Sequence, residues 1–437
     1  MTNQKAANCS SAIQTAGEIF PDGAVIELLR DLASPEHLTL VRRQAGTLQL
    51  KPEVSHADRT YEPMHVNRSV SKAIRFPTRV ATPEPTRKLF TAVHKLFSSR
   101  LGQLDSCVTA MVFAVFASWM SPLLPMAPIL SIFAPAGSPK DSALQLLGVL
   151  CRRPIRLAGL KRGELLRVPM SLQPTLLLDE TDLRPAMQSI LEAGTQKGSY
   201  VPSSDGMRDL FGPKIVCSRK PLLGTELEAH ALRIALIPVS EPLPILDTKV
   251  QEDLAEEFQA RFLGYFLGNC GSVQIPKFDV GGLAPPFQGL ARAFGAAVVG
   301  DEELQAKIIP LLSVQDEEIR SNRASAFDSV VVEAGLFFIH QGGWSKVRAE
   351  STAEKVEAIY KGRGSDREVS PESVGWAWKR LRIPSGRINR AGNGIELTVP
   401  TCRLIHQLAI SFGVRAIQGG PRDDCRFCRE LEKQPKT

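Results

Sequence analysis

The chain has 437 residues, 43% of them hydrophobic and 23% charged, a balance typical of a soluble globular protein with two to four domains. Lysine and arginine outnumber aspartate and glutamate by 53 to 46, and the net charge of +7 is compatible with a nucleic-acid partner without requiring one. The eight cysteines stand mostly alone in apolar surroundings and residues 1–11 are polar. We therefore expect a cytoplasmic protein with reduced thiols and no secretory signal.

The first 85 residues predict a small β-rich region with a flexible start. Residues 1 to about 18 have the composition of a loose tail. Two apolar stretches, 38–41 and 47–50, flank a polar connection and predict a β-hairpin. Residues 54–85 are polar and interrupted by prolines, so we expect an irregular arm whose arginines either contact nucleic acid or are solvated.

The most apolar segment spans residues 107–120 and follows an amphipathic helical pattern at 86–101. It is shorter than the roughly 20 residues that a helix needs to cross a bilayer, and three prolines follow it. We therefore predict a helix buried against a sheet, and no membrane contact.

A strand, a loop with a lysine, a helix and an acidic strand end follow one another in the middle of the chain. The apolar run 129–133 breaks at a loop of small residues, and a helical pattern begins at Ser142. A second apolar run, 175–178, ends in Asp179 and Glu180. This order is the layout of a P-loop nucleoside triphosphatase.

The loop itself departs from the intact pattern G-x-x-x-x-G-K-[ST], in which backbone N–H groups and the lysine hold phosphate and the hydroxyl holds Mg²⁺. Ala134 and Pro139 stand where the glycines belong. Asp141 replaces the hydroxyl residue, and only Lys140 is retained. Pro139 supplies no N–H, and the Asp141 carboxylate repels phosphate unless a metal lies between them. A solvated lysine at a strand end is the alternative; the candidate cofactor-binding positions are Gly137, Ser138, Lys140 and Asp141.

The acidic pair predicts Mg²⁺ chemistry, because ligands of open α/β sheets bind at the carboxyl edge. We assign Asp179 to Mg²⁺ through water and Glu180 to polarising the attacking water, against the alternative of solvated acids at an ordinary strand end. A third apolar strand, 214–218, ends in Ser218, which either senses the γ-phosphate or bonds to local backbone. Strands alternating with helices predict an α/β fold, with a mostly parallel sheet and helices on both faces.

A winged-helix pattern in the order helix, helix, hairpin, helix occupies residues 346–415, with its first helix predicted over 352–360. Ser370, followed by proline and glutamate, predicts a helix start. A hairpin of 386–388 and 395–399 and a last helix over 402–412 follow.

Residues 361–390 hold eight lysines or arginines and three acids, a charge excess suited to DNA phosphates. Winged helices also dock proteins, and this alternative stays open. The candidate DNA-binding residues are Lys379, Arg380, Arg382, Arg387 and Arg390.

The tail, residues 416–437, carries an isolated C-x-x-C at Cys425 and Cys428. Cys402 and His406 share a helix face and would complete a zinc site. A lone C-x-x-C more commonly supplies two thiols without a metal, so we expect no zinc and a His406 packed under the wing.

Over roughly residues 105 to 430 the chain resembles P-loop ATPase proteins of bacterial phages, plasmids and integrated elements, which are related to primase–helicase ATPase domains. The resemblance lies in the order of five segments: 176–180, 190–194, 197–200, 211–218 and 369–375.

The resemblance implies an ATPase core with a winged-helix end that acts on DNA during replication or maintenance of an element. By this resemblance Lys140 would contact phosphate and Asp179 the metal. Glu180 would contact the attacking water, and Ser218 would sense the γ-phosphate. The chain departs from the family in its loop and in having His230, with Arg233 three residues on, where an arginine often precedes the last core strand. Such an arginine finger is worth about 10³–10⁵ in rate where it operates, so these departures imply slow or absent turnover.

Three hypotheses follow. We favour a degenerate ATPase-like protein that binds DNA, with ATP and Mg²⁺ held weakly or lost. The alternatives are a non-enzymatic DNA-binding or scaffolding protein and an active helicase or motor, and any of these could form homo-oligomers. The expected domains are 1–85 (β-rich), 86–247 (ATPase-like core), 248–345 (helical), 346–415 (winged helix) and 416–437 (tail).

Overall fold

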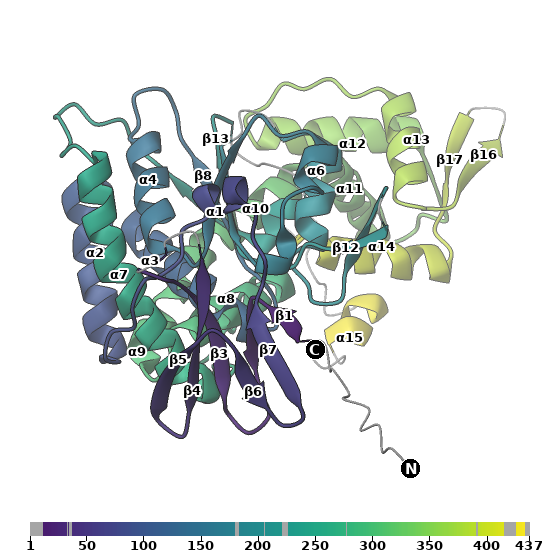
Figure 1. Cartoon of the computed structure of the whole chain (residues 1–437). Helices are drawn as coiled ribbons and strands as arrows, with labels where there is room; N and C mark the ends of the chain where they lie inside the picture. The colour runs from purple at the N-terminus through teal and green to yellow at the C-terminus, as the bar shows by residue number, and fades with distance from the viewer. Residues whose placement is uncertain are drawn as a thin grey trace, which may run out of the picture. The chain divides into compact units, whose positions relative to one another are not determined.

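The computed structural model describes residues 12–32, 34, 37–179, 183–204, 206–220, 226–276, 278–389, 392–414 and 425–432. They belong to two compact units, Met1–Gln315 and Asp316–Thr437, whose boundary falls within helix α10 (Ile308–Ser325) (Figure 1).

A five-stranded sheet lies at the centre of the first unit, and all of its strand pairs are parallel. The order across the sheet is β14-β8-β13-β10-β9, so β8 lies two strands away from β10. The α/β class predicted from the sequence, a mostly parallel sheet with helices on both faces, is confirmed. The strands are β8 (Ile129–Phe133), β9 (Pro154–Ala158), β10 (Thr175–Asp179), β13 (Lys214–Ser218) and β14 (Ala231–Ala235).

Alternate residues of each strand face opposite layers of the unit. Leu177 of β10 lies against Gly148 of α4 (Lys140–Leu150) on one face. Its neighbours Leu176 and Leu178 belong to a buried cluster with α6 (Pro185–Ala193) and the N-terminal strands on the other face. Both faces are therefore covered, which explains why the strands read as continuous apolar runs.

Aromatic rings join the helices of the first unit. The Phe116 ring of α3 (Asp105–Met120) lies 5.2 Å from Phe262 and 5.1 Å from Tyr265, both on α7 (Thr248–Asn269). By length and composition Asp105–Leu123 passes as a membrane span, with a mean hydropathy of 1.6, yet 83% of its apolar window is buried within the protein. It is a core helix, as predicted. The other helices of this unit are α2 (Thr86–Leu101), α5 (Arg162–Leu165), α8 (Pro285–Ala297) and α9 (Glu302–Ala306), and a two-stranded hairpin joins β11 (Tyr200–Ser203) to β12 (Gly206–Asp209).

The N-terminal region contains more regular structure than the sequence predicts. The hairpin of β4 and β5 is confirmed, with left-handed backbone at Ala45 and Gly46 in its turn. The irregular arm predicted for 54–85 is wrong in its first half, because two strands and a short helix form there; short polar strands carry too weak an alternation to be recognised. The elements are β1 (Ile13–Thr15), β2 (Gly17–Ile19), β3 (Val25–Arg30), β4 (Leu38–Gln44), β5 (Thr47–Lys51), β6 (Val54–His56), β7 (Arg59–Pro63) and α1 (Arg68–Ala73).

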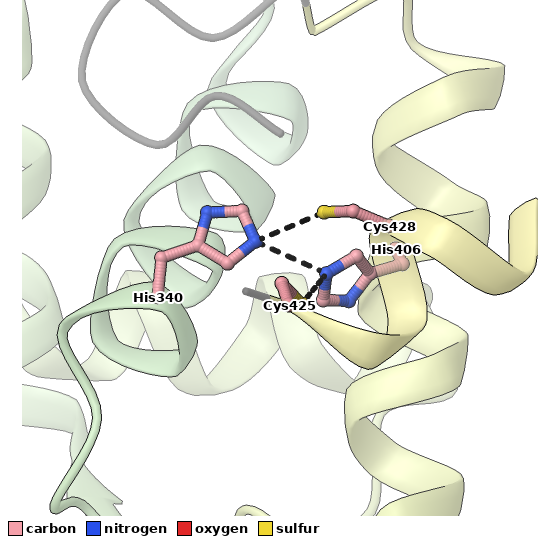
Figure 2. A group of neighbouring side chains, drawn as sticks. All are labelled: His340, His406, Cys425 and Cys428. Atoms are coloured by element: carbon pink, nitrogen blue, oxygen red, sulfur yellow. Dashed lines mark hydrogen bonds between the residues drawn. The ribbon is translucent and has the colours of Figure 1, made fainter. Parts of the chain in front are cut away.

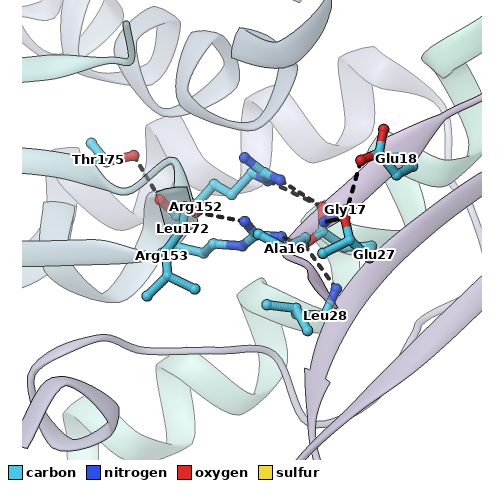
Figure 3. A network of polar contacts seen from close by, with 10 residues as sticks. Ala16, Gly17, Glu18, Glu27, Leu28, Arg152, Arg153, Leu172 and Thr175 are labelled. Atoms are coloured by element: carbon cyan, nitrogen blue, oxygen red, sulfur yellow. Dashed lines mark hydrogen bonds and ion pairs between the residues drawn. The ribbon is translucent and has the colours of Figure 1, made fainter. Parts of the chain in front are cut away.

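A buried ionic network joins this β-rich region to the amino end of the parallel sheet (Figure 3). Glu27 of β3 accepts hydrogen bonds from Arg152, at 2.7 Å from Nη2, and from Arg153. Arg153 also donates to the carbonyl oxygens of Leu172, at 2.6 Å, and Ala16. All three charged side chains are at most 3% exposed.

The protonation of this network follows from its burial. Burial raises the pKa of Glu27, but the two guanidinium groups outweigh that effect and hold the pKa below its ordinary value. Burial, and then the neighbouring Arg152, lower the pKa of Arg153 to about 10. Glu27 therefore stays ionised at neutral pH, where its charge is matched by hydrogen bonds rather than by water.

Lys214, the first residue of β13, is a second buried charge. Its Nζ lies 2.7 Å from the carbonyl oxygen of Gly194, 2.7 Å from that of Gly212 and 3.1 Å from that of Leu210. Burial lowers the pKa of Lys214 to about 7, against an opposing effect of Asp209. The side chain ties the end of α6 to the turn that leads into β13.

The second unit has the helix, helix, hairpin, helix order predicted from the sequence, and a third strand pairs with the hairpin. The Ser370 hydroxyl accepts a hydrogen bond from the N–H of Ser373 at 3.2 Å, which confirms the predicted helix start. The second hairpin strand lies three residues earlier than predicted. The elements are α11 (Phe327–Gln341), β15 (Lys346–Arg348), α12 (Ala349–Gly362), α13 (Pro371–Arg380), β16 (Ser385–Asn389), β17 (Gly392–Glu396), α14 (Val399–Ser411) and α15 (Arg426–Glu432).

The structure changes one of the residues that the sequence groups with the C-x-x-C. The sequence names Cys402 and His406 as the residues that could complete a zinc site, whereas the thiols of Cys425 and Cys428 lie against His406 and His340. His406 is buried in α14, and its packing under the wing stays a prediction. Contacts between distant helices, which no local pattern records, bring His340 to this place.

We expect Glu27→Gln to lower the free energy of unfolding by about 3–5 kcal/mol, because it leaves two buried guanidinium groups without a compensating charge. Urea unfolding at neutral pH measures the change. Glu53→Gln, at an exposed position, is the matched control and should shift stability by no more than about 0.5 kcal/mol. Equal effects of the two substitutions would contradict a stabilising role for the network.

The lowered pKa of Lys214 predicts that the free energy of unfolding depends on pH. The unfolded chain keeps the lysine proton up to about pH 10.4, whereas the folded chain loses it near pH 7, so the unfolded state binds more protons between these values. This group alone therefore makes stability rise with pH, by up to about 1.4 kcal/mol per pH unit. The difference in unfolding free energy between the wild type and Lys214→Met, measured across that window, should show this slope. A difference that does not change with pH would refute the shifted pKa of Lys214.

Candidate nucleotide-binding site at the sheet edge

The carboxyl edge of the parallel sheet brings together the lysine and the acid that the sequence singles out. Lys140 is the first residue of α4, after the loop that follows β8, and Asp179 is the last residue of β10. The lysine Nζ lies 2.6 Å from Asp179 Oδ1, although 39 residues separate them in the chain. Glu180 lies outside the described residues.

Two further charged residues complete what we call the edge cluster: Lys140, Asp141, Arg156 and Asp179. Arg156 of β9 places its Nη2 2.7 Å from Asp179 Oδ2 and 2.7 Å from Asp141 Oδ1. Both carboxylate oxygens of Asp179 thus contact a cation. The two positive and two negative side chains cancel, so the edge cluster has no net charge.

The contacts fix the protonation of these groups. Burial raises the pKa of Asp179, but hydrogen bonds from Arg156 and Lys140 outweigh it and bring the pKa below its ordinary value. Cys217 of β13, the neighbour of Asp179 in the sheet, has a pKa raised to about 12 by burial. Asp179 is therefore a carboxylate at neutral pH, and Cys217 is a neutral thiol that takes no part in acid–base chemistry.

Hydrogen-bond donors of the loop before α4 bond to carbonyl oxygens of the same loop. The N–H of Ser138 donates to the Pro135 carbonyl oxygen at 3.1 Å, and the Ser138 hydroxyl donates to the same atom at 2.7 Å. The N–H of Lys140 donates to the Ser138 carbonyl at 2.8 Å, and Pro139 has no N–H. Gly137 supplies left-handed backbone with a φ of 82°. Donors that would surround phosphate in an intact P-loop are thus used within this loop.

The structure gives the other predicted site residues local partners. The hydroxyl of buried Ser218 donates to the carbonyl oxygen of Lys220, and its role as a γ-phosphate sensor stays a prediction. Arg233 pairs with Glu228 at 2.7 Å, and His230 lies 3.5 Å from Glu192.

Sequence reasoning missed Arg156, which bridges both aspartates. A single arginine in a short strand carries no recognisable signal, because most such residues are solvated. The parallel pairing of β9 with β10 places Arg156 opposite Leu177, two residues before Asp179, and its side chain reaches the Asp179 carboxylate.

Of the candidate DNA-binding residues, Lys379 and Arg380 lie on α13, Arg382 lies in the turn that follows it and Arg387 lies on β16. Lys379, Arg382 and Arg387 are exposed, and Lys379 lies over the Trp376 ring at 4.8 Å from its centroid. Arg380 instead forms a two-point contact with Asp328, with Nε 3.1 Å from Oδ2. Arg390 lies outside the described residues.

No protein-family model matches the chain, and no curated protein sequence matches it. Among solved structures it is similar to the apo C-terminal region of NrS-1, with 10% identity and a TM-score of 0.36 over 85% of this chain and 97% of that one. It is also similar to the active helicase Cch of SCCmec type IV, with 10% identity and a TM-score of 0.39 over 90% of this chain and 80% of that one. A third similar structure is the ORC1 protein of Aeropyrum pernix in complex with DNA, with 15% identity and a TM-score of 0.21 over 77% of this chain and 95% of that one. At such low identities and TM-scores, these likenesses assign neither a family nor a function to the chain.

The edge cluster predicts that replacing Asp179 with a neutral residue strengthens ATP binding, the opposite of the effect in a working Mg²⁺ site. Asp179→Asn removes a negative charge from the phosphate position and frees Lys140, so we expect ATP affinity to increase, by up to about tenfold for a gain of about 1.4 kcal/mol. In a working Mg²⁺ site the same change would weaken ATP·Mg²⁺ binding. Titration calorimetry with and without Mg²⁺ distinguishes the two. Asp58→Asn, in an exposed turn, is the control that should leave ATP affinity unchanged.

Proposed function

We propose that the chain is a degenerate P-loop ATPase-like protein that associates with DNA and has weak or lost ATP hydrolysis. The observation that carries this proposal is the edge cluster. Lys140, which would contact phosphate in an intact P-loop, has its Nζ 2.6 Å from Asp179 Oδ1. Binding a nucleotide would require that contact to break.

The edge cluster gives a triphosphate no net electrostatic attraction, because Lys140 and Arg156 are already matched by Asp141 and Asp179. The amino end of α4 contributes only about 0.3–1 kcal/mol to binding an anion. The backbone N–H groups of Ser138 and Lys140 are used inside the loop. A nucleotide would therefore have to break existing ion pairs and find few free donors in return.

One observation favours an active motor as the second candidate. Asp141 and Asp179 contact the same Arg156 nitrogen, each at 2.7 Å. A Mg²⁺ ion in place of the guanidinium would find two oxygen ligands of the kind it prefers. This state needs Arg156 to withdraw, which is why we rank it second.

DNA association is proposed for the second unit. Exposed Lys379 lies on α13 and exposed Arg387 on β16, which correspond to the recognition helix and wing of the predicted module, and exposed Arg382 lies in the turn between them. Together with the family resemblance, this supports a cytoplasmic protein of the primase–helicase type that serves replication or maintenance of a mobile element. A scaffold with the same DNA contacts and no nucleotide is the non-enzymatic form of this proposal.

The test combines turnover with DNA binding. We expect ATP hydrolysis by the wild type to equal that of Lys140→Ala, with or without DNA, and DNA affinity to be independent of ATP. The double variant Lys379→Ala/Arg387→Ala should bind DNA more weakly and reduce the slope of log K against log[salt] by about 1.8, or about 0.9 for each lost phosphate contact.

The matched control is Lys51→Ala, which removes an exposed cation from the first unit and should leave the salt slope unchanged. Hydrolysis that depends on Lys140 would establish the motor instead. If the double variant leaves the salt slope unchanged, α13 and the hairpin do not contact DNA and this part of the proposal is wrong.

A further inference from the structure

Four side chains with metal-binding atoms converge inside the second unit (Figure 2). His340 comes from the end of α11, His406 from α14, and Cys425 and Cys428 from the start of α15. One ligand atom from each residue lies within 4.8 Å of all the others. We call these four residues the tail cluster.

Three of the six distances between the ligand atoms of the tail cluster are close to the edges of a zinc tetrahedron. The two imidazole Nε2 atoms are 3.2 Å apart. Cys425 Sγ is 3.4 Å from His406 Nε2, and Cys428 Sγ is 3.3 Å from His340 Nε2. With Zn–N of about 2.0 Å and Zn–S of about 2.3 Å, tetrahedral edges are about 3.3–3.8 Å long.

A hydrogen bond fixes the orientation of one ligand. His406 Nδ1 lies 2.7 Å from the carbonyl oxygen of Cys402, which can only accept, so Nδ1 carries the proton. The lone pair of a neutral His406 is then on Nε2, the atom that faces the other three residues. A backbone carbonyl that orients a histidine in this way is the usual second contact of a zinc ligand. Cys402 thus contributes its backbone to the site, and its thiol is not among the ligand atoms.

We propose that His340, His406, Cys425 and Cys428 bind one zinc ion in a closed, structural site. Two thiols lose their protons to solvent on binding, and two thiolates with two neutral imidazoles cancel the charge of Zn²⁺. A neutral site suits these surroundings, because both histidines are buried and both cysteines are half-buried. Four protein ligands leave no position for substrate, which assigns the ion to folding and not to catalysis.

The ion would hold α15 against the core of the unit. This helix has seven residues, too few to be stable alone in water. Apart from the ligands, buried Phe427 packs at 5.3 Å from the His406 ring, and Arg403 pairs with Glu430 at 3.1 Å on the exposed side. The zinc ion would add one bond to α11, one to α14 and two to the residues at the start of α15.

Zinc content of the full chain, purified without a metal-binding tag, tests the proposal. We expect about one zinc per chain by plasma mass spectrometry and, after replacement with Co²⁺, the visible spectrum of a tetrahedral thiolate site. Cys425→Ser and Cys428→Ser should each reduce the zinc content to about a tenth or less. Cys402→Ser, a buried thiol of the same helix as His406, should retain it.

Zinc removal by a chelator supplies a readout that does not depend on the folding of a variant. We expect a lower midpoint of thermal unfolding, restored by adding back Zn²⁺, and faster proteolytic loss of the C-terminal segment. A wild-type chain with no bound zinc after refolding with added Zn²⁺ would overturn the proposal. So would a disulfide between Cys425 and Cys428 under reducing conditions, or zinc retained equally by all three serine variants.

Discussion

The ion pair between Lys140 and Asp179 depends on the order of strands in the central sheet. Because β13 separates β8 from β10, a lysine after the first strand and an aspartate at the end of the other meet across one neighbouring strand. Parallel pairing places all of these ends at the same edge. The chemistry available to the site is thus decided by topology first and by residue identity second.

Ionic groups occur at both ends of this sheet, and they differ in exposure. At the amino end, Glu27 and two arginines are almost completely buried and join the β-rich region to the core. At the carboxyl end, Asp141 and Arg156 of the edge cluster remain substantially exposed. Removing a partner at the amino end therefore costs stability, whereas the same change at the carboxyl end mainly changes which ions the edge attracts.

The sequence predicted the parts of the fold that local patterns encode. Strand β13 and helix α2 have the predicted bounds, because apolar runs and amphipathic spacing end at glycine, proline or polar residues. Lys140 and Asp179 could be named because the P-loop layout predicts their meeting.

The remaining site residues depend on contacts between segments far apart in the chain. Glu27 and Arg152 are 125 residues apart, and His340 lies 66 residues before His406. Neither a lone glutamate in a strand nor a lone histidine at a helix end differs locally from a solvated residue. The C-x-x-C and His406 could be named from the sequence, but His340 becomes evident as their neighbour only when α11, α14 and α15 are packed together.

The position of Arg156 on an edge strand limits which substitutions could open this edge of the sheet to a ligand. Restoring glycines to the loop would free backbone donors, yet the guanidinium would still occupy the space between the two aspartates. Shortening Arg156 alone would leave a proline-containing loop and two adjacent carboxylates. Under the proposed function, a change at the loop and a change at Arg156 would therefore have to occur together.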